Sequence, residues 1–327
     1  MEKVRVAMVG CGGFQRYRVS NLQQVREAEI VALVDPSDEQ INLMREQRPV
    51  TAGAPAFHDH REMLEQVKPD AIMIATPHTQ HVDQILDGLA AGAHVCCEKP
   101  LVTSVADAHR VIEARDKAGK IGMVSYQRHF QAEFRFIRDK IASGEAGAVQ
   151  YIQVLQTQEW LRATKGTWRQ LHSLSGGGQL NDSGSHVIDI VLWTTQMSPK
   201  AVSAFTDNKG TEVDINSSVS ITFQSGAMGS IAIVGDGMSW HEDVTIICDA
   251  MAFFVRDGKL TTVDRARNRM KAEHLSGGST PDQNFIHSIL GKVENESPFE
   301  CGLEVIRLTE AAWQSAAQGG AAVTVTG

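Results

Sequence analysis

Two short stretches near the N-terminus carry residues whose types and spacing suit the binding of a dinucleotide. The first is Gly10-Cys11-Gly12-Gly13-Phe14-Gln15, which follows the apolar run 4–9. Gly10 lets the chain turn sharply after a strand. Gly12 has no Cβ that would keep a pyrophosphate away from the amides at a helix N-terminus. The second is Asp35, which ends the run 29–34 about twenty residues later, the spacing of an acid that binds a ribose diol.

Both features also have plainer interpretations. A Gly-x-Gly segment in a β-rich stretch is often only a turn, and Asp35 before Pro36 and Ser37 is typical of a residue that starts a turn. Gln15 stands where a small residue usually permits close helix–strand packing, so the glycine pattern is incomplete. The two halves together predict dinucleotide binding. Asp35 would repel a 2′-phosphate and no Arg follows it directly, which favours NAD over NADP.

A further set of residues suits the oxidation of an alcohol. This chemistry needs a nicotinamide against the carbinol carbon, a base for the hydroxyl proton and a group that stabilises the oxygen charge. Lys99, which follows a predicted strand, suits the last role or a shared acid–base role. Asp182 and His186 are four residues apart, so on a helix they would share one face, where a carboxylate can fix the tautomer of an imidazole. We therefore predict that His186 accepts the hydroxyl proton and that Asp182 orients it or binds a second hydroxyl.

Each of these residues also has a structural explanation. Lys99 precedes a proline and could be an ordinary surface lysine in a turn. Asp182 could cap a helix, in competition with Ser183. His186 begins the apolar run 186–193 and could be a hydrogen-bonded core histidine. The residues alone leave these structural roles ahead of the catalytic ones.

Length and charge exclude several classes of protein. With 327 residues, the chain is too long for one ordinary core and suits two domains. Its formal net charge of −8 argues against nucleic acid as a partner, and no apolar run is long enough to span a bilayer. The N-terminus enters a strand without a signal-peptide pattern, so we expect a cytoplasmic protein. The five scattered cysteines fit neither a disulfide framework nor zinc-ligand spacing, and no metal site is predicted.

Strand and helix signals alternate over residues 1–126. The run 70–75 is continuous and apolar, as in a strand buried on both faces of a parallel sheet. Repeated alternation predicts right-handed crossovers and a doubly wound α/β sheet, which is a Rossmann dinucleotide-binding domain. Ligands bind at the carboxyl ends of such strands, so we expect one edge to carry the loops at Gly10, Asp35, Thr76 and Glu98.

The pattern changes over residues 127–327, where alternating β-rich runs are separated by turn residues. Runs such as 217–223 predict an α+β substrate-binding domain with a large, mostly antiparallel open sheet, and a closing helix is expected near 303–317. One face of an open sheet needs covering. We therefore predict a homo-oligomer, a dimer or a tetramer, formed through this sheet.

Several motifs together resemble one family of oxidoreductases. Glu98-Lys99-Pro100 after a strand, three glycines at 176–178 and Asp182-x-x-x-His186 form a specific combination. Over nearly its whole length the chain resembles the glucose–fructose oxidoreductase, inositol dehydrogenase and rhizopine-catabolism family (Gfo/Idh/MocA). Two residues depart from the family pattern: Gln15 replaces the third small residue, and His78 stands where the family often has Asn.

The resemblance implies that Lys99 is the catalytic lysine and that Asp182 and His186 complete the catalytic set. It implies an NAD(P)-dependent dehydrogenase of a sugar, a glycoside or a cyclic polyol. Two alternatives stay open: a redox-assisted glycosidase or lyase that retains its NAD, and a dinucleotide-sensing regulator without catalysis. The predicted cofactor-binding residues are Gly10, Gly12, Gly13, Phe14, Gln15, Asp35, Thr76, Pro77, His78, His81, Glu98, Lys99 and Gln127, and the predicted substrate-binding residues are Lys99, Arg128, Trp168, Arg169, Asp182 and His186.

Overall fold

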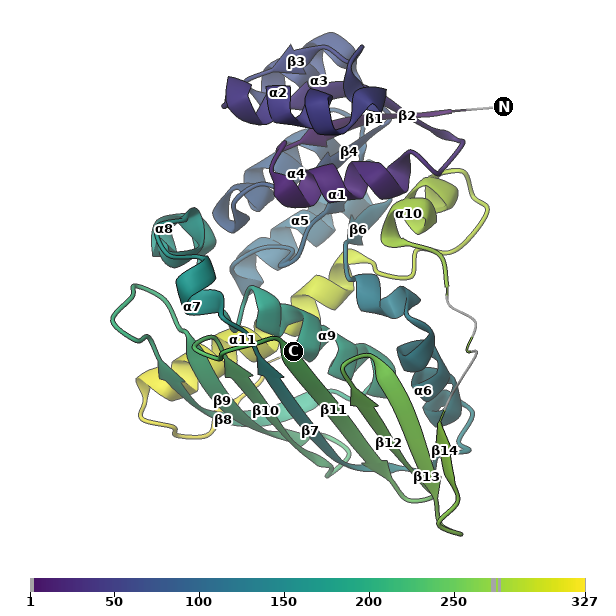
Figure 1. Ribbon diagram of the computed structural model, residues 1–327, viewed down its shortest axis with the longest axis vertical. Coiled ribbons are helices and arrows are strands. Elements are labelled where there is room, and N and C mark those ends of the chain that lie inside the picture. The colour runs from purple at the N-terminus through teal and green to yellow at the C-terminus, as the bar shows by residue number, and fades with distance from the viewer. Residues whose placement is uncertain (1–2, 272–274, 276–277, 327) are drawn as a thin grey trace. The chain divides into compact units, whose positions relative to one another are not determined.

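The computed structural model describes residues 3–271, 275 and 278–326, which fall into two compact units (Figure 1). The first unit comprises Met1–Val102, Ala106–Gln127 and Ser279–Gly302. The second comprises Thr103–Val105, Arg128–Gly278 and Leu303–Gly327. The first unit therefore contains a segment that returns to it after the chain has passed through most of the second.

The first unit is built on a six-stranded parallel sheet in the order β3-β2-β1-β4-β5-β6. This is the doubly wound order in which the direction of chain progression reverses between β1 and β4, and a crevice opens at that point. All residues of β4 are buried, as the apolar run predicted. The strands are β1 (Val4–Val9), β2 (Ala28–Val34), β3 (Ala56–Phe57), β4 (Ala71–Ile74), β5 (His94–Cys97) and β6 (Gly122–Val124). The predicted Rossmann sheet is confirmed.

Several helices of the first unit begin at residues that satisfy their free backbone N–H groups. Ser37 accepts from the N–H of Gln40 at the start of α2, and Asp59 accepts from the N–H groups of Arg61 and Glu62 at the start of α3. The helix α1 is an exception, because its N-cap residue is a glycine. The helices are α1 (Gly13–Leu22), α2 (Asp38–Gln47), α3 (His60–Val67), α4 (His81–Ala90), α5 (Val105–Ala118) and α10 (Pro281–Ile289).

The second unit is built on a nine-stranded sheet in the order β14-β13-β12-β11-β7-β10-β9-β8-β15. The pair β7–β10 is parallel and the other pairs are antiparallel, which confirms the predicted open, mostly antiparallel sheet. The strands are β7 (Val149–Thr157), β8 (Pro199–Asp207), β9 (Asn216–Phe223), β10 (Met228–Val234), β11 (His241–Cys248), β12 (Met251–Arg256), β13 (Lys259–Asp264), β14 (Arg269–Lys271) and β15 (Val323–Thr324).

Helices cover one face of this sheet (Figure 1). Along β9 every second residue is buried, so one set of side chains packs under the helices and the other lies on the opposite face. Short helical turns occupy much of the segment 161–179, for which the sequence showed no periodicity. The helices are α6 (Ala132–Ala142), α7 (Trp160–Ala163), α8 (His172–Ser175), α9 (Ser183–Thr195) and, from Leu303 onward, α11 (Phe299–Ala317). None of the helices in the described part of the chain combines the length and hydropathy needed to cross a membrane.

Candidate functional site

The turn after β1 leaves the N-terminus of α1 open to a ligand. Gly10 has a φ of +88°, and a Cβ at this position would lie 2.5 Å from the carbonyl oxygen of Ala75. Gly12 is the N-cap of α1 and provides no side-chain cap, and a Cβ on it would meet no described atom within 4 Å. The first N–H groups of α1 therefore face open space, where the helix dipole favours an anion.

Asp35 is held in a fixed orientation at the end of β2. Its Oδ2 accepts a hydrogen bond from the N–H of Cys11 at 2.8 Å, and its Oδ1 accepts one from the N–H of Ser37 at 2.9 Å. Each oxygen keeps a further lone pair for a ligand hydroxyl. The carboxylate lies at a cavity of about 300 Å³ in the first unit, whose lining includes Gly10, Asp35, His58, Thr76, Thr79 and Gln84.

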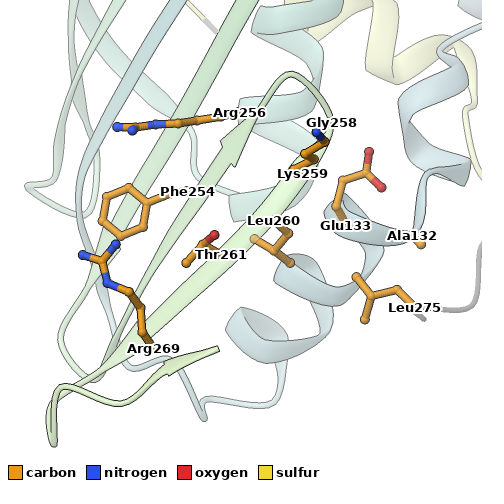
Figure 2. Close-up of a pocket in the computed structure, with 10 residues that line it drawn as sticks. All are labelled: Ala132, Glu133, Phe254, Arg256, Gly258, Lys259, Leu260, Thr261, Arg269 and Leu275. Atoms are coloured by element: carbon orange, nitrogen blue, oxygen red, sulfur yellow. The ribbon is translucent and has the colours of Figure 1, made fainter. Parts of the chain in front are cut away.

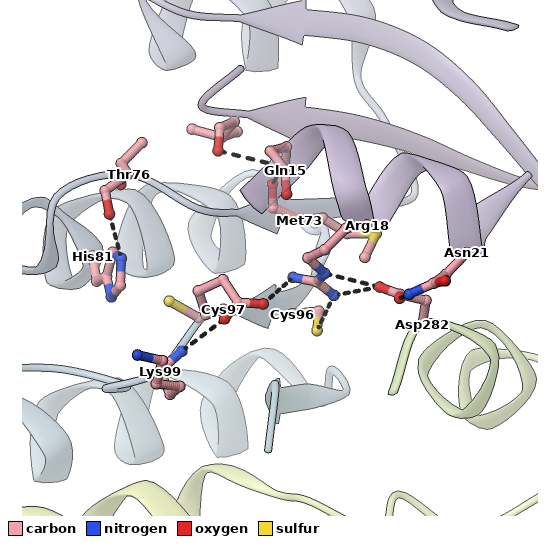
Figure 3. A network of polar contacts seen from close by, with 12 residues as sticks. Gln15, Arg18, Asn21, Met73, Thr76, His81, Cys96, Cys97, Lys99 and Asp282 are labelled. Atoms are coloured by element: carbon pink, nitrogen blue, oxygen red, sulfur yellow. Dashed lines mark hydrogen bonds and ion pairs between the residues drawn. The ribbon is translucent and has the colours of Figure 1, made fainter. Parts of the chain in front are cut away.

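Gln15 fills the space that a smaller residue would leave between α1 and the sheet. Its side chain is fully buried, and Nε2 donates a hydrogen bond of 2.7 Å to the carbonyl of Met73 in β4 (Figure 3). Although Gln15 departs from the glycine pattern, its side chain packs between α1 and the sheet, and its buried Nε2 has a hydrogen-bond acceptor. The side chain points into the unit, so a cofactor contact by Gln15 falls to its backbone N–H in the first turn of α1.

His81 joins the loops that follow β4 and β5. Its Nε2 lies 3.0 Å from the carbonyl oxygen of Thr76 (Figure 3), and its Nδ1 lies 2.9 Å from that of Pro100. Burial lowers the pKa of His81, and a neutral imidazole donates to only one of these carbonyls at a time. The side chain of Thr76 donates to Gln84 at 2.6 Å, and His78 is buried next to His81 with the ring centroids 5.8 Å apart.

Glu98 and Lys99 follow β5 and differ in their exposure. Glu98 is buried, and its Oε1 lies 3.3 Å from Nη1 of Arg18. Burial raises the pKa of Glu98, and the guanidinium of Arg18 and the ammonium of Lys99 oppose that rise. Lys99 is half-buried. The predicted cofactor residues of the first unit thus lie on the loops after β1, β2, β4 and β5, and Gln127 follows β6.

Three buried cysteines of the first unit are packing residues. Cys11, Cys96 and Cys97 are buried and form no disulfide. Burial raises the pKa of Cys11 to about 12 and that of Cys96 to about 11, so both remain thiols near neutral pH.

In the second unit, the carboxylate of Asp182 meets an indole and a guanidinium. Its Oδ2 accepts hydrogen bonds from Nε1 of Trp160 at 3.0 Å and from Nε of Arg169 at 3.1 Å. The guanidinium carbon of Arg169 lies 4.5 Å from the ring centroid of Trp168. The structure therefore brings together three predicted substrate residues, and it adds Trp160, which the sequence analysis missed. A buried indole N–H needs an acceptor, but the sequence does not indicate which one.

Asp182 precedes α9, and His186 lies in its first turns. Asp182 occupies the N-cap position with φ −81° and ψ −86°, and its side chain makes no capping hydrogen bond. Its direction is set by Trp160 and Arg169 rather than by helical spacing. His186 is half-buried.

The three-glycine segment before Asp182 is a site of close packing. A Cβ on Gly178 would lie 1.9 Å from the carbonyl oxygen of Asp214. The carboxylate of Asp214 accepts from the N–H groups of Gly178 and Leu180 and from Nε1 of Trp313. These contacts fix the backbone that leads into Asp182.

The predicted substrate residue Arg128 and its neighbour His129 each belong to a buried polar pair. Nη2 of Arg128 lies 2.6 Å from Oε2 of Glu242, which also accepts from Nε2 of Gln156 at 2.9 Å. Nη1 of Arg128 is buried and has no hydrogen-bond partner among the described residues, so one donor remains for a ligand. In the second pair, His129 contacts Asp189 at 2.9 Å and stacks on a tryptophan ring. Glu242 and Gln156 had no sequence signal, because they lie on separate strands.

A larger cavity of about 700 Å³ lies elsewhere in the second unit, at β12, β13 and the start of α6 (Figure 2). Phe254, Arg256 and Arg269 lie on one side of it, with Glu133 and Leu275 on the other (Figure 2). The described residues that line it include none of the predicted site residues.

Models of one family match both parts of the chain. The model of the oxidoreductase family with an NAD-binding Rossmann fold matches residues 4–126, and the model of the GFO/IDH/MocA C-terminal domain matches residues 134–253. The chain belongs to the Gfo/Idh/MocA oxidoreductase family. The resemblance drawn from the Glu98-Lys99-Pro100 and three-glycine motifs is confirmed.

Known proteins with similar sequences or structures match between about 60% and nearly all of this chain. The rhizopine catabolism protein MocA of Rhizobium meliloti is 27% identical over 61% of this chain and 59% of its own length, which is less than two thirds of that protein. D-glucoside 3-dehydrogenase of Escherichia coli is 24% identical over 97% of this chain and 96% of its own. The crystal structure of the WlbA dehydrogenase from Bordetella pertussis with NADH and UDP-GlcNAcA has a TM-score of 0.86 and is 25% identical, covering 99% of this chain and 98% of that one.

Proposed function

We propose that this family member is an NAD-dependent dehydrogenase that moves a hydride between a CH–OH group of a sugar, glycoside or cyclic polyol and a nicotinamide. The observation that carries the proposal is the arrangement of the first unit. An open helix N-terminus, a fixed Asp35 and Lys99 follow three strands of one parallel sheet. A relative named for a glucoside and a similar structure that holds a nucleotide sugar support the substrate class.

The residues of the first unit fit a dinucleotide. The N–H groups at the start of α1, after Gly12, would hold the pyrophosphate, and Asp35 would accept from the adenosine ribose diol. A 2′-phosphate on that ribose would bring a second negative charge to Asp35, which supports NAD over NADP. When bound, the nicotinamide supplies the hydride acceptor.

The protein side chains handle the proton and the oxygen charge. Lys99 stabilises the developing oxygen charge, and His186 takes the hydroxyl proton. Asp182 and Arg169 bind further hydroxyls. The carboxylate of Asp182 accepts a hydrogen bond from a hydroxyl and the guanidinium of Arg169 donates one, and the two groups already contact each other at 3.1 Å. Arg128 adds a guanidinium whose Nη1 is free to donate.

Measuring NAD and NADP binding and nicotinamide absorbance with a panel of sugars, glycosides and inositols tests this proposal. We expect reduction of NAD with at least one member of the panel. Lys99→Ala should abolish turnover while NAD still binds, whereas Lys117→Ala, at an exposed position of the same unit, should behave as wild type. Full activity of Lys99→Ala would refute the assignment. Product formation without net reduction of NAD would favour the redox-assisted lyase.

Asp35→Ala tests the choice of cofactor. Losing two hydrogen bonds to the ribose should weaken NAD binding by about tenfold or more, and NADP binding should weaken less. An unchanged ratio of the two dissociation constants would remove Asp35 from the ribose site.

We also propose that the face of the nine-stranded sheet opposite its helices joins two or more copies of the chain. Large apolar side chains are exposed there: Tyr151 is 37%, Met228 54% and Phe205 63% exposed. Such side chains are typical of a buried interface. Met228→Glu should shift the mass measured by light scattering toward that of one chain, and an unchanged mass would contradict an interface at this position.

A further inference from the structure

We propose that Arg18 is a positioning residue for Lys99, because it holds the buried carboxylate that precedes this lysine in the chain. The inference rests on the proposed function, which makes Lys99 catalytic. It concerns side chains of the first unit only.

Arg18 is enclosed by groups that can pair with a guanidinium. It projects from α1 and is 1% exposed. Nε and Nη2 contact Oδ1 of Asp282 at 2.8 and 2.7 Å, and Nη2 contacts Sγ of Cys96 at 3.1 Å (Figure 3). Nη1 lies 3.3 Å from Oε1 of Glu98. A buried guanidinium is tolerated only with such partners, so each contact constrains where the others can lie.

The two carboxylates do not share Arg18 equally. Asp282 receives two short contacts, whereas Glu98 receives one longer contact. Neither Nη1 of Arg18 nor Oε1 of Glu98 makes another hydrogen bond within the described residues. The Arg18–Glu98 contact is therefore an ion pair at Oε1, while Oε2 of Glu98 accepts a hydrogen bond from the backbone N–H of Lys99 at 3.4 Å.

The network places the turn 98–100, which carries Lys99. One guanidinium contacts two carboxylates, and Lys99 follows one of them directly in the chain. The position of the Glu98 carboxylate therefore constrains the backbone from which the Lys99 side chain projects.

Two contacts from different parts of the first unit hold the turn 98–100 in place. Arg18 and Glu98 hold it from the interior, and the hydrogen bond between His81 and the Pro100 carbonyl holds it from the loop after β4. The interior contact depends on Asp282 of α10, which lies 264 residues after Arg18 in the chain. The returning segment 279–302 thus supplies the anchor for the lysine turn.

Three substitutions test whether Arg18 positions the turn that carries Lys99. Arg18→Lys keeps the positive charge but cannot span both carboxylates, so kcat should fall by about 10- to 100-fold while the Kd for NAD changes by less than about threefold. Glu98→Gln keeps the size of the side chain but removes its ion pair with Arg18, which loosens the turn. The rate at which acetic anhydride modifies Lys99, followed by peptide mass spectrometry, should therefore rise by about three- to tenfold at fixed pH, because the amine of a loosened turn is more accessible. Asp282→Asn removes the anchor of Arg18 and should act in the same direction.

Glu300 lies in the same returning segment as Asp282 and forms an ion pair with Arg115. Glu300→Gln is therefore the matched control, because it also removes a carboxylate from an ion pair. It should leave kcat, NAD binding and Lys99 acetylation at wild-type values. The inference is overturned if Arg18→Lys, Glu98→Gln and Asp282→Asn, folded and binding NAD, match this control in kcat and in Lys99 acetylation. If only one of the three folds, that variant alone decides. Full activity of Lys99→Ala would instead refute the proposed function, and Lys99 acetylation can be measured without a known substrate.

Discussion

Each unit contains several carboxylate–guanidinium pairs, and Arg18–Asp282 in the first unit differs in exposure from Arg169–Asp182 in the second. The side chains of Arg18 and Asp282 are 2% and 3% exposed, whereas those of Arg169 and Asp182 are 37% and 7% exposed. A buried pair is costly to break and holds its surroundings in place. A half-exposed guanidinium can turn toward a ligand at little cost. The same two chemical groups therefore suit positioning at Arg18 and recognition at Arg169.

Removing the buried guanidinium should have the largest effect. Arg18→Met leaves Asp282 and Glu98 buried without a cation, so the free energy of unfolding should fall by about 3–5 kcal/mol. Urea denaturation followed by circular dichroism measures this change. Arg162→Met, which removes an exposed guanidinium from an ion pair with Glu159, should leave the midpoint near the wild-type value. Equal urea midpoints for Arg18→Met and Arg162→Met would contradict the prediction that the buried pair stabilises the fold more than the exposed pair.

Removing the half-exposed guanidinium should affect the substrate rather than the fold. Arg169→Met loses a charged hydrogen-bond donor worth about 1.5–3 kcal/mol, so KM should rise by about 10- to 100-fold. The urea midpoint should change far less than in Arg18→Met. A wild-type KM for every accepted substrate would remove Arg169 from substrate binding.

Stability should also depend on pH through the buried thiol of Cys96, which contacts Arg18. Burial raises the pKa of Cys96 from 9.0 to about 11. Between these values the unfolded chain has lost the thiol proton while the folded protein retains it. The free energy of unfolding therefore decreases as pH rises through this window, by on the order of 2 kcal/mol.

Urea titrations at several alkaline pH values measure this slope. Cys96→Ala should make it shallower, although other buried thiols still contribute, whereas Cys301→Ala, at a partly exposed cysteine, should leave it unchanged. A slope that is the same in wild type and Cys96→Ala would show that the thiol does not titrate differently on folding.

The smallest effect is expected from the indole that shares Asp182 with Arg169. Trp160→Phe keeps an aromatic ring but removes the N–H that donates to Asp182. This hydrogen bond orients the carboxylate and is worth about 1 kcal/mol, so kcat/KM should fall several-fold. Steady-state kinetics on the identified substrate measure this. A larger loss than in Arg169→Met would reverse the roles assigned to the two donors.

Local sequence patterns predicted the elements where one pattern dominates. The buried run of β4 and the alternation of β9 were both indicated by their apolar residues. The strand β13 was missed, although Asp257-Gly258 before it is a strong hairpin signal. Both residues have positive φ, +47° and +77°, as a two-residue hairpin turn requires. The parallel pairing of β7 with β10 had no local signal, because their partners are set by the whole sheet.

The residue types at the candidate site were predicted better than their contacts. The spacing of Asp182 and His186 suggested one helical face, but Asp182 precedes the helix and its carboxylate turns toward Trp160 and Arg169. The partner of Glu98 was unknown, because Arg18 is distant in the chain and resembles any polar helix residue. Such pairings depend on which elements pack together, and the local patterns of a single sequence do not indicate which distant elements meet.

By itself the sequence determined the Rossmann sheet, the glycine turn after β1, Asp35 at its spacing and the family motifs, because each depends on neighbours within a few residues. Only the tertiary structure decided that the segment 279–302 returns to the first unit and that Asp282 anchors Arg18 beneath the lysine turn. The physical reason is burial. A charged side chain enters the interior only where a partner from another element meets it, and that meeting is a property of the packed fold rather than of any local stretch.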